Sequence, residues 1–468
     1  MHSKKRLLLA YPNQRWQKDD INTVWDLNPT TLCLLAAMVK DIVDVKIVDA
    51  QFHNMAREEF AREVETFNPN FVGISIMSSE YRDILDIAAK IIKDIDKNII
   101  VIAGGVHVTT NYDYVIRNKN IDYCVRGEGE YVLRQLIRYL IEKSDFFSEG
   151  LQNQAFVQDL SQLPWPAYDL TDFKAYVEKP PRPHAGGPPL LPYVRMTTTR
   201  GCPFGCSFCQ VGIISGKKVR SRNPEDVVNE LAFLKREYGI RSVLFEDDNL
   251  LMAGNKYAQT LFSLMIERNL NLKWVGNAFA LFLLNDKILD LMRDSGCVGV
   301  NVAIESGNER VLREIVKKPI KDLNKVPEII KKIKSRGMFC IANFIIGFPG
   351  EKWDEIRETV SYAENCGADY IKLFVAVPLY GTELYRISRE MGALVSNDEY
   401  PNIDWRYSQI QSGEWTAKDI SILRAYEWDR INFAPDRIKK TAEIWHMSID
   451  ELNDIRKKTR DNLTFQPN

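Results

Sequence analysis

Short β-branched runs alternate with helical segments along most of the 468-residue chain, and this alternation constrains its fold more than any other feature. Such a rhythm favours a parallel sheet with helices on both faces. The expected strands of the first series are residues 6–10, 45–48, 71–77, 99–103 and 123–126. The helical segments between them are residues 30–40, 55–67 and 81–95. The first part of the chain is therefore predicted to be a doubly wound α/β domain.

A stretch rich in proline and glycine interrupts this rhythm, and its composition is typical of a linker. A second alternating series then begins. Its expected strands are residues 194–198, 242–245, 274–278, 299–304, 341–346 and 370–375. Six strand–helix units predict a partial (β/α)6 barrel, and charged helices are expected after it. The predicted division is a first domain at 1–145, a linker at 146–192, a partial barrel at 193–385 and a C-terminal helical region at 386–468.

Composition and charge exclude several classes of function. Lys and Arg total 62 against 63 Asp and Glu, so no overall positive charge attracts nucleic acid. No apolar stretch approaches the roughly 18 to 20 residues of a membrane span. The apolar run at 7–10 follows a basic start but is too short for the core of an export signal. We therefore expect a cytoplasmic protein that neither crosses a membrane nor binds nucleic acid.

Three of the eight cysteines, Cys202, Cys206 and Cys209, cluster on a glycine-containing loop directly after an expected strand. Their spacing can bring three thiolates to one object the size of an inorganic cluster. A four-iron cluster can use three cysteines and leave one iron open to a bound molecule. A structural zinc ion needs four protein ligands. The fourth could only be His184, if the chain before the cysteines folded back onto the loop. A zinc knuckle and thiols without a shared ligand are the alternatives. The other five cysteines are isolated, and core filling is the expected role for them.

The segment from 202 to 209 resembles the Cys-x3-Cys-x2-Cys signature of radical S-adenosylmethionine (radical SAM) enzymes. This resemblance implies a [4Fe–4S] cluster whose open iron chelates S-adenosylmethionine (SAM), and a reductive cleavage that yields a 5′-deoxyadenosyl radical. It places Phe208 beside the adenine. The resemblance extends over residues 193–385 and implies that strand-end residues contact SAM or shape its binding site. Those residues are Glu246, Asp247, Glu305, Ser306 and Gly347. A helix cap, a loop anchor or a simple turn is the alternative role for each.

A doubly wound domain ahead of a Pro-rich linker and the cysteine loop resembles the cobalamin-binding radical SAM subfamily. The strand-end loops that carry the resemblance imply cobalamin contacts from Ser78, Gly104, Gly105, Gly127 and Glu128. His53 is displaced from the position where related domains carry a cobalt-ligating histidine, so the loop at 11–16 is left to face the lower side of the cobalt. His107 either contacts the nucleotide tail or is an ordinary hydrogen-bonded loop histidine. A vestigial domain without cobalamin is the alternative.

Together these resemblances imply methyl transfer to a poorly activated carbon or phosphorus centre, in which one SAM methylates the cobalt and another supplies the radical. Oxidative cyclisation or rearrangement with the same cofactors is one alternative. A non-catalytic cobalamin or iron–sulfur sensor, which would form no deoxyadenosine, is the other. The expected partners are a small-molecule substrate of biosynthetic type and a flavodoxin- or ferredoxin-like electron donor protein. The sequence identifies no catalytic residue.

Overall fold

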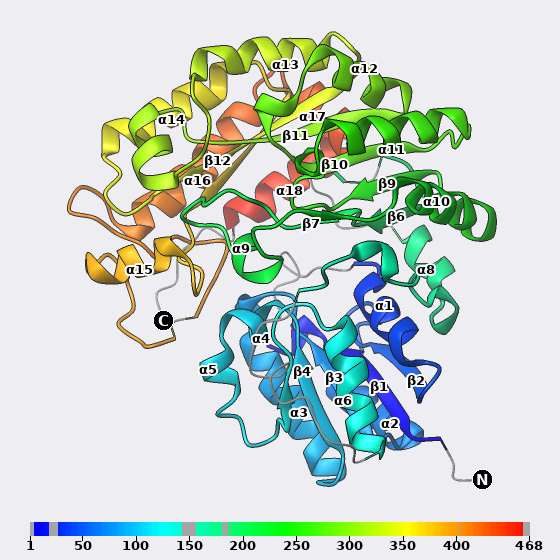
Figure 1. Cartoon of the computed structure of the whole chain (residues 1–468). Coiled ribbons are helices and arrows are strands. Elements are labelled where there is room, and N and C mark those ends of the chain that lie inside the picture. The colour runs from blue at the N-terminus through cyan, green and yellow to red at the C-terminus, as the bar shows by residue number, and fades with distance from the viewer. Residues whose placement is uncertain are drawn as a thin grey trace. The chain divides into compact units, whose positions relative to one another are not determined.

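The computed structural model describes residues 4–17, 27–142, 156–179, 186–187, 189–400 and 402–461 (Figure 1). The chain forms two compact units. The first comprises Met1–Arg182 with Ile213–Gly216, and the second comprises Pro183–Gly212 with Lys217–Asn468. None of the helices in the described part of the chain is long and apolar enough to cross a membrane.

The first unit is built on a parallel five-stranded sheet with the order β2-β1-β3-β4-β5. Its strands are β1 (Arg6–Tyr11), β2 (Asp44–Asp49), β3 (Phe71–Ser75), β4 (Ile100–Gly104) and β5 (Tyr123–Cys124). The helices are α1 (Thr30–Val39), α2 (Arg57–Phe67), α3 (Arg82–Ile95), α4 (Val106–Thr110), α5 (Tyr112–Val115) and α6 (Glu130–Glu142). The strand order reverses between β1 and β3, and ligands of such sheets bind outside the strand ends at this point.

Alternate residues of the first strand lie in two different cores. Leu8 packs with Phe60 of α2 and Ile84 of α3, whereas Leu7 packs with Leu32 of α1 and Leu136 of α6. Both faces of the sheet are thus covered by helices, which explains why the strands read as continuous apolar runs. The predicted doubly wound architecture of the first domain is confirmed.

Part of the Pro-rich stretch belongs to the first compact unit. Helix α8 (Phe173–Glu178) places the Tyr176 hydroxyl 3.1 Å from Asp49 Oδ2, to which it donates a hydrogen bond. The backbone N–H of Ala167 donates to the carbonyl of Cys33 at 2.9 Å. The described residues 156–179 therefore pack on the first sheet. The boundary predicted at 145 lies outside the described residues, and the four-part division of the chain stays a proposal.

The second unit contains a parallel six-stranded sheet with the order β13-β12-β11-β10-β9-β6. Its strands are β6 (Tyr193–Met196), β9 (Ser242–Phe245), β10 (Lys273–Phe279), β11 (Cys297–Glu305), β12 (Phe339–Ile346) and β13 (Tyr370–Val375). The helices between them are α10 (Pro224–Tyr238), α11 (Asn255–Glu267), α12 (Asp286–Asp294), α13 (Val326–Lys334) and α14 (Trp353–Asn365). All six predicted strands are present in this order, as a partial barrel requires.

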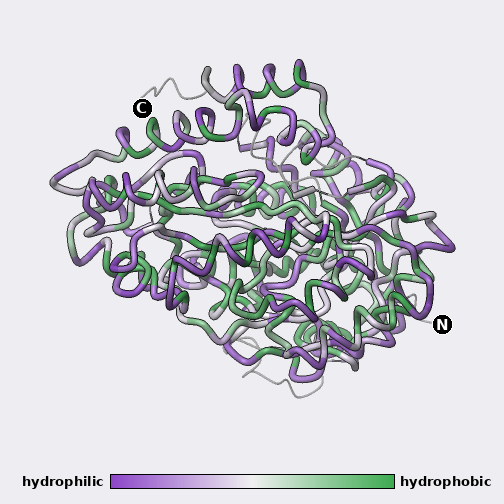
Figure 2. Tube along the Cα trace, turned by 90° about the horizontal axis from the view of Figure 1, so that it is seen from above, coloured by the Kyte–Doolittle hydropathy of each residue, from purple (hydrophilic) through white to green (hydrophobic). Residues whose placement is uncertain are grey.

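Local sequence signals set several helix ends in the second unit. Asn223 caps α10 by accepting the backbone N–H of Glu225 at 2.9 Å, Pro224 occupies the first turn, and Gly239 ends the helix with φ of 67°. Helical coils of the chain show both hydrophilic and hydrophobic residues within successive turns (Figure 2). This pattern is typical of helices that cover a sheet on one side and face water on the other.

The C-terminal region is helical, as expected. It consists of α15 (Glu383–Glu390), α16 (Ala417–Asn432), α17 (Ile438–Trp445) and α18 (Ile449–Asp461). The side-chain amide of Asn432 bonds both the N–H and the carbonyl of Ile371, at 2.8 Å each. Helix α16 is thereby fixed along β13, the edge strand of the sheet.

Candidate functional site

The cysteine loop leaves the sheet through β7 (Thr199–Arg200), which pairs antiparallel with β8 (Arg220–Ser221) and closes the loop at its base. Cys202, Cys206 and Cys209 are all partly exposed. Burial raises the pKa of all three thiols, for Cys209 to about 12, and each later cysteine is also affected by the charge of the earlier ones. The three thiols therefore lie close together, and metal binding must displace their protons.

Two carboxylates after β9 hold the start of this loop. Asp247 is buried, and its Oδ1 accepts hydrogen bonds from the backbone N–H and the hydroxyl of both Thr198 and Thr199. The N–H of Gly201 donates to Asp248 Oδ2 at 2.8 Å. Burial raises the pKa of Asp247 to about 6, although the four donors oppose this shift. Asp247, which the sequence places among the SAM contacts, is thus an anchor of the loop.

The middle of the loop is fixed from two further directions. The Ser207 N–H donates to the carbonyl of Val316 at 3.0 Å, and the Leu384 N–H donates to the Ser207 carbonyl at 2.8 Å. Val316 ends the π-helix η7 (Val311–Val316), and Leu384 lies in α15. The ring of Phe208 lies 6.2 Å from that of Phe348, measured between centroids. Segments that follow β11 and β13 therefore position a loop that follows β6.

A buried ion pair lies next to the thiols. Lys318 Nζ is 2.9 Å from Glu305 Oε1, and the two side chains are 15% and 7% exposed. The charge of Lys318 lowers the pKa of Cys202 and Cys206, against the larger effect of burial. Glu305 has φ of 76°, which a non-glycine residue rarely adopts. Sequence reasoning missed Lys318, although a lysine pair soon after the Glu305-Ser306 strand end was a visible signal.

The remaining predicted SAM-site residues are also engaged within the second unit. Glu246 forms an ion pair with Arg195 and accepts a hydrogen bond from Asn277 Nδ2 at 3.3 Å. Ser306 is fully buried, lies 2.9 Å from the Thr359 hydroxyl, and accepts the Asn308 N–H at 3.1 Å. These contacts give both residues a structural role at the ends of their strands.

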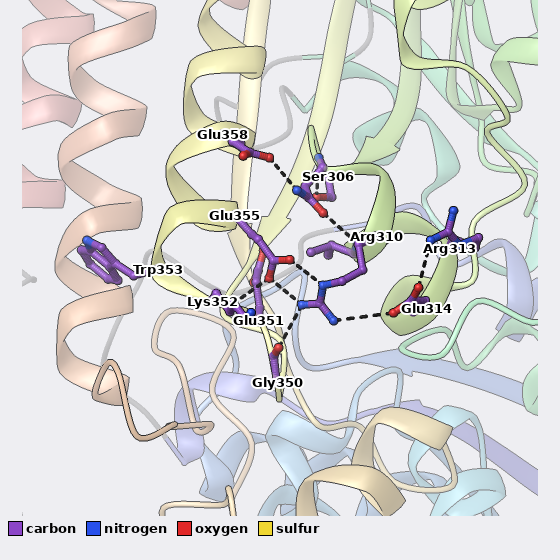
Figure 3. A network of polar contacts seen from close by, with 12 residues as sticks. Ser306, Arg310, Arg313, Glu314, Gly350, Glu351, Lys352, Trp353, Glu355 and Glu358 are labelled. Atoms are coloured by element: carbon purple, nitrogen blue, oxygen red, sulfur yellow. Dashed lines mark hydrogen bonds and ion pairs between the residues drawn. The ribbon is translucent and has the colours of Figure 1, made fainter.

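A polar network supports the loop after β12 (Figure 3). The N–H groups of Gly347 and Phe348 donate to Glu351 Oε2 at 2.7 and 3.0 Å, and Gly347 needs its φ of 83° for this turn. Burial raises the pKa of Glu351 to about 8. Arg310 donates to both oxygens of Glu355 at 2.5 Å and to the Gly350 carbonyl at 3.1 Å. The loop at 347–351 is therefore rigidly held beside the end of β11.

The strand-end loops of the first sheet are formed mainly by small residues. Gly105 has φ of 93°, and a Cβ there would lie 2.6 Å from the Ile76 carbonyl oxygen. Ser78 caps the turn η2 (Ser79–Tyr81) by accepting the N–H of Glu80, and the Gly127 N–H donates to the Thr109 hydroxyl at 2.9 Å. Gly104 ends β4 and packs near Val125. Glu128 accepts the Val157 N–H at 2.5 Å.

The two histidines of this region differ in their surroundings. His53 is exposed, whereas His107 is 1% exposed and lies 3.3 Å from Asn111 through Nδ1. Burial lowers the pKa of His107 to about 3, so its ring is neutral. Its Nε2 is buried and has no hydrogen-bond partner among the residues that the structure describes. In the loop at 11–16, the N–H of Gln14 donates to Gln51 Oε1 at 2.7 Å.

The donor set fits the expected cofactors. Across the described ranges, no three His, Cys, Asp or Glu side chains converge as one metal ion would require. Three neighbouring thiols on a loop with an open glycine, Gly205, suit a larger iron–sulfur cluster, whose ligands stand farther apart than those of one ion. The small residues at the ends of β3, β4 and β5, on one side of the β1–β3 switch point, suit a large ligand that approaches the backbone.

Comparisons with known proteins agree with both halves of this description. Residues 196–363 match the radical SAM superfamily, and residues 21–137 match the B12-binding domain family. The chain is 31% identical over 442 residues to an uncharacterised methyltransferase of Pyrococcus horikoshii, covering 90% of this chain and 91% of that protein. It is 27% identical over 443 residues to the cytidylyl-2-hydroxyethylphosphonate methyltransferase of Streptomyces wedmorensis, covering 85% and 82%.

Solved structures show the same fold. The cobalamin-dependent SAM radical enzyme OxsB with aqua-cobalamin bound superposes with a TM-score of 0.72 at 14% identity. The alignment covers 98% of this chain and 72% of that structure. Both sheets and the C-terminal helices thus have counterparts in one known architecture.

Proposed function

This chain belongs to the cobalamin-dependent radical SAM enzymes, and we propose that it is a methyltransferase that acts on a poorly activated centre through a 5′-deoxyadenosyl radical. Its cofactors are a [4Fe–4S] cluster, SAM and cobalamin. The observation that carries the proposal is the similarity to methyltransferases over nearly the whole chain, including both cofactor domains. When bound, the cluster supplies the electron that cleaves SAM, and cobalamin carries the methyl group.

The residues of the second unit have distinct roles in this proposal. Cys202, Cys206 and Cys209 would hold the cluster and leave one iron for the amino and carboxylate groups of SAM. Asp247 keeps the start of the loop fixed through its four hydrogen bonds, so the thiols are pre-positioned. Phe208 would lie against the adenine, next to Phe348.

The strand ends of this unit would complete the SAM site. Glu246, Glu305, Ser306 and Gly347 fix the loops around it through the contacts described above. Lys318 balances the charge of Glu305 and adds a cation beside the thiols. These residues orient the reactants, and their rigidity limits misplacement of the cleaved group.

The first unit would bind cobalamin at the switch point of its sheet. Ser78, Gly104, Gly105, Gly127 and Glu128 lie at the ends of β3, β4 and β5, on one side of this point, and offer backbone groups and small side chains. The exposed His53 is not assigned to the cobalt, and the loop at 11–16 is the proposed neighbour of its lower side. We also propose a small biosynthetic substrate, a flavodoxin- or ferredoxin-like electron donor, and a cytoplasmic location, where thiols stay reduced.

Anaerobic reconstitution with iron, sulfide and hydroxocobalamin tests this assignment. We expect about four irons per chain, one bound cobalamin in the visible spectrum, and 5′-deoxyadenosine after reduction with SAM. Cys206→Ala should lose iron and deoxyadenosine, whereas Cys366→Ala, a buried cysteine outside the loop, should retain both. Iron and deoxyadenosine without cobalt would make the first domain vestigial and rule out methyl transfer through cobalamin.

SAM with a deuterated methyl group separates the remaining alternatives. Transfer of the label to bound cobalamin, detected by mass spectrometry, supports a methyltransferase. Deoxyadenosine without label transfer supports oxidative cyclisation or rearrangement with the same cofactors. Neither product would point to a non-catalytic sensor, because a sensor does not cleave SAM.

A further inference from the structure

The two faces of the six-stranded sheet of the second unit differ towards the carboxyl ends of its strands. Nearer the amino ends both faces are apolar, as where Ile341 and Tyr370 pack with Ile444. One face packs on the helices and is apolar, as where Trp274 stacks on Phe262 of α11 with ring centroids 5.1 Å apart. Residues that alternate with these point to the other face. There, the middle and carboxyl ends of five strands contribute polar side chains, which we term the polar face. Its members are Arg195, Glu246, Asn277, Asn343 and Lys372.

Two of the three charges on the polar face cancel. Arg195 and Glu246 form an ion pair with side chains 12% and 21% exposed, and Asn277 donates to the same carboxylate. Lys372 has no such partner, because its ammonium makes no hydrogen bond or ion pair with any residue that the structure describes. Desolvation lowers the pKa of Lys372 to about 8, so the ammonium is still the main form at neutral pH.

An uncompensated, half-buried ammonium costs folding free energy, and an apolar residue would suit the strand better. The adjacent strand places a second polar group beside it. Asn343 is in register with Lys372, and its amide makes no hydrogen bond with the described residues, while its Oδ1 is buried. The next residue in register, Ala303, adds only a methyl group. The ammonium of Lys372 and the amide of Asn343 thus lie in neighbouring register positions, and neither contacts an anion among the described residues.

We propose that Lys372 and Asn343 form a binding site for a carboxylate or phosphate-type anionic group of the substrate. The inference rests on the proposed function, since it assigns the polar face of the barrel to the molecule that is modified. An ammonium and an amide N–H supply the charge and the directed donor that such an oxyanion requires. The surplus positive charge of the polar face is what an anion would neutralise.

The carboxylate of SAM has the same chemistry but a different expected place. The thiols lie on the loop that follows β7, whereas Lys372 lies within β13, in register with Asn343 of β12. Those thiols would hold the cluster, whose open iron would chelate the SAM carboxylate. Lys372 is therefore assigned to the substrate.

The test uses the reconstituted holoenzyme and methylphosphonate as the anionic probe, titrated by 31P NMR with saturating SAM and without it. We expect binding to the wild type in both cases, at least tenfold weaker binding to Lys372→Met and Asn343→Leu, and binding within threefold of wild type for Lys372→Arg. Lys287→Met, an exposed lysine on α12 with the same loss of charge, should bind as the wild type does.

Three results would overturn the proposal. These are no binding to the wild type, equal binding to Lys372→Met, and displacement of the probe by SAM together with a tenfold loss of SAM affinity in Lys372→Met. The last result would assign the site to the SAM carboxylate. Deoxyadenosine formed on reduction is measured in parallel, and Lys287→Met should form as much of it as the wild type does. Absence of deoxyadenosine from the wild type would contradict the proposed function. The titration with methylphosphonate would still decide separately whether Lys372 and Asn343 bind an anion.

Discussion

The predicted site of the first sheet consists mainly of glycine and serine, whereas that of the second sheet includes three carboxylates, Glu246, Asp247 and Glu305. At the first, Gly105 and Gly127 shape the backbone, and Glu128 accepts a backbone N–H. At the second, Glu246 and Glu305 are paired with cations, and Asp247 is saturated with donors through one oxygen. The first arrangement suits a large preformed ligand, and the second suits reactants whose charge changes during the reaction.

Removing the anchor of the cysteine loop should have the largest effect. In Asp247→Ala, two backbone N–H groups and two hydroxyls lose their acceptor, at about 1 to 3 kcal/mol for each buried donor left unsatisfied. We expect a loss of several kcal/mol from the unfolding free energy and little bound iron, measured by urea unfolding and iron analysis. Asp354→Ala, whose side chain is 90% exposed, is the control. Full iron content in Asp247→Ala would show that the loop supports itself.

A substitution at a strand-end glycine of the first sheet should weaken cobalamin binding and leave the iron content unchanged. In Gly105→Ala, the new Cβ meets the Ile76 carbonyl oxygen, and φ of 93° is unfavourable for alanine. We expect at least a tenfold loss of cobalamin affinity with unchanged iron. In Gly129→Ala the new Cβ makes ordinary contacts at 3.5 Å and 3.6 Å, so cobalamin binding should persist. If Gly105→Ala also lost iron, cobalamin binding by the first sheet and iron binding by the second would not be independent.

A smaller effect should appear in the pH dependence of stability. Glu351 has a folded pKa of about 8 against an ordinary value of 4.5, so folding favours its protonated form. The contribution of Glu351 to the free energy of unfolding is fully present below about pH 4.5. It is lost as the pH rises towards 8, by up to about 1.4 kcal/mol per pH unit. Glu351→Gln should therefore become more stable than wild type across this range. Urea unfolding followed by far-UV circular dichroism at each pH is the measurement. Parallel pH curves for the two proteins would contradict the assignment.

The smallest effect is expected for His53→Ala. The side chain is exposed, and the sequence around it departs from the pattern of a cobalt ligand. The affinity for cobalamin should stay within twofold of wild type, and the visible spectrum of the bound cobalamin should not shift. A shifted spectrum would instead identify His53 as a ligand of the cobalt. The first sheet would then bind its cofactor through a metal-binding side chain, as the second sheet is proposed to do.

The strands were predictable because buried parallel strands leave continuous β-branched runs between helical periods. The expected strand 194–198 ends at Met196 instead, since Thr198 turns towards Asp247. Partners of this kind depend on tertiary contacts across 49 residues, which local patterns do not encode. The Cys202 loop was visible through spacing alone. Lys318 and Lys372 were not singled out, because a single lysine carries no signal until its neighbours in space are known.

The contact between Asn432 and Ile371 has a wider consequence for the barrel. An open sheet exposes a row of unsatisfied backbone groups along its last strand, and such rows recruit strands from other molecules. Here the side-chain amide of Asn432 accepts a hydrogen bond from the N–H of Ile371 and donates one to its carbonyl, as a neighbouring strand would. At Ile371, therefore, the edge of the sheet offers no free backbone group to another strand.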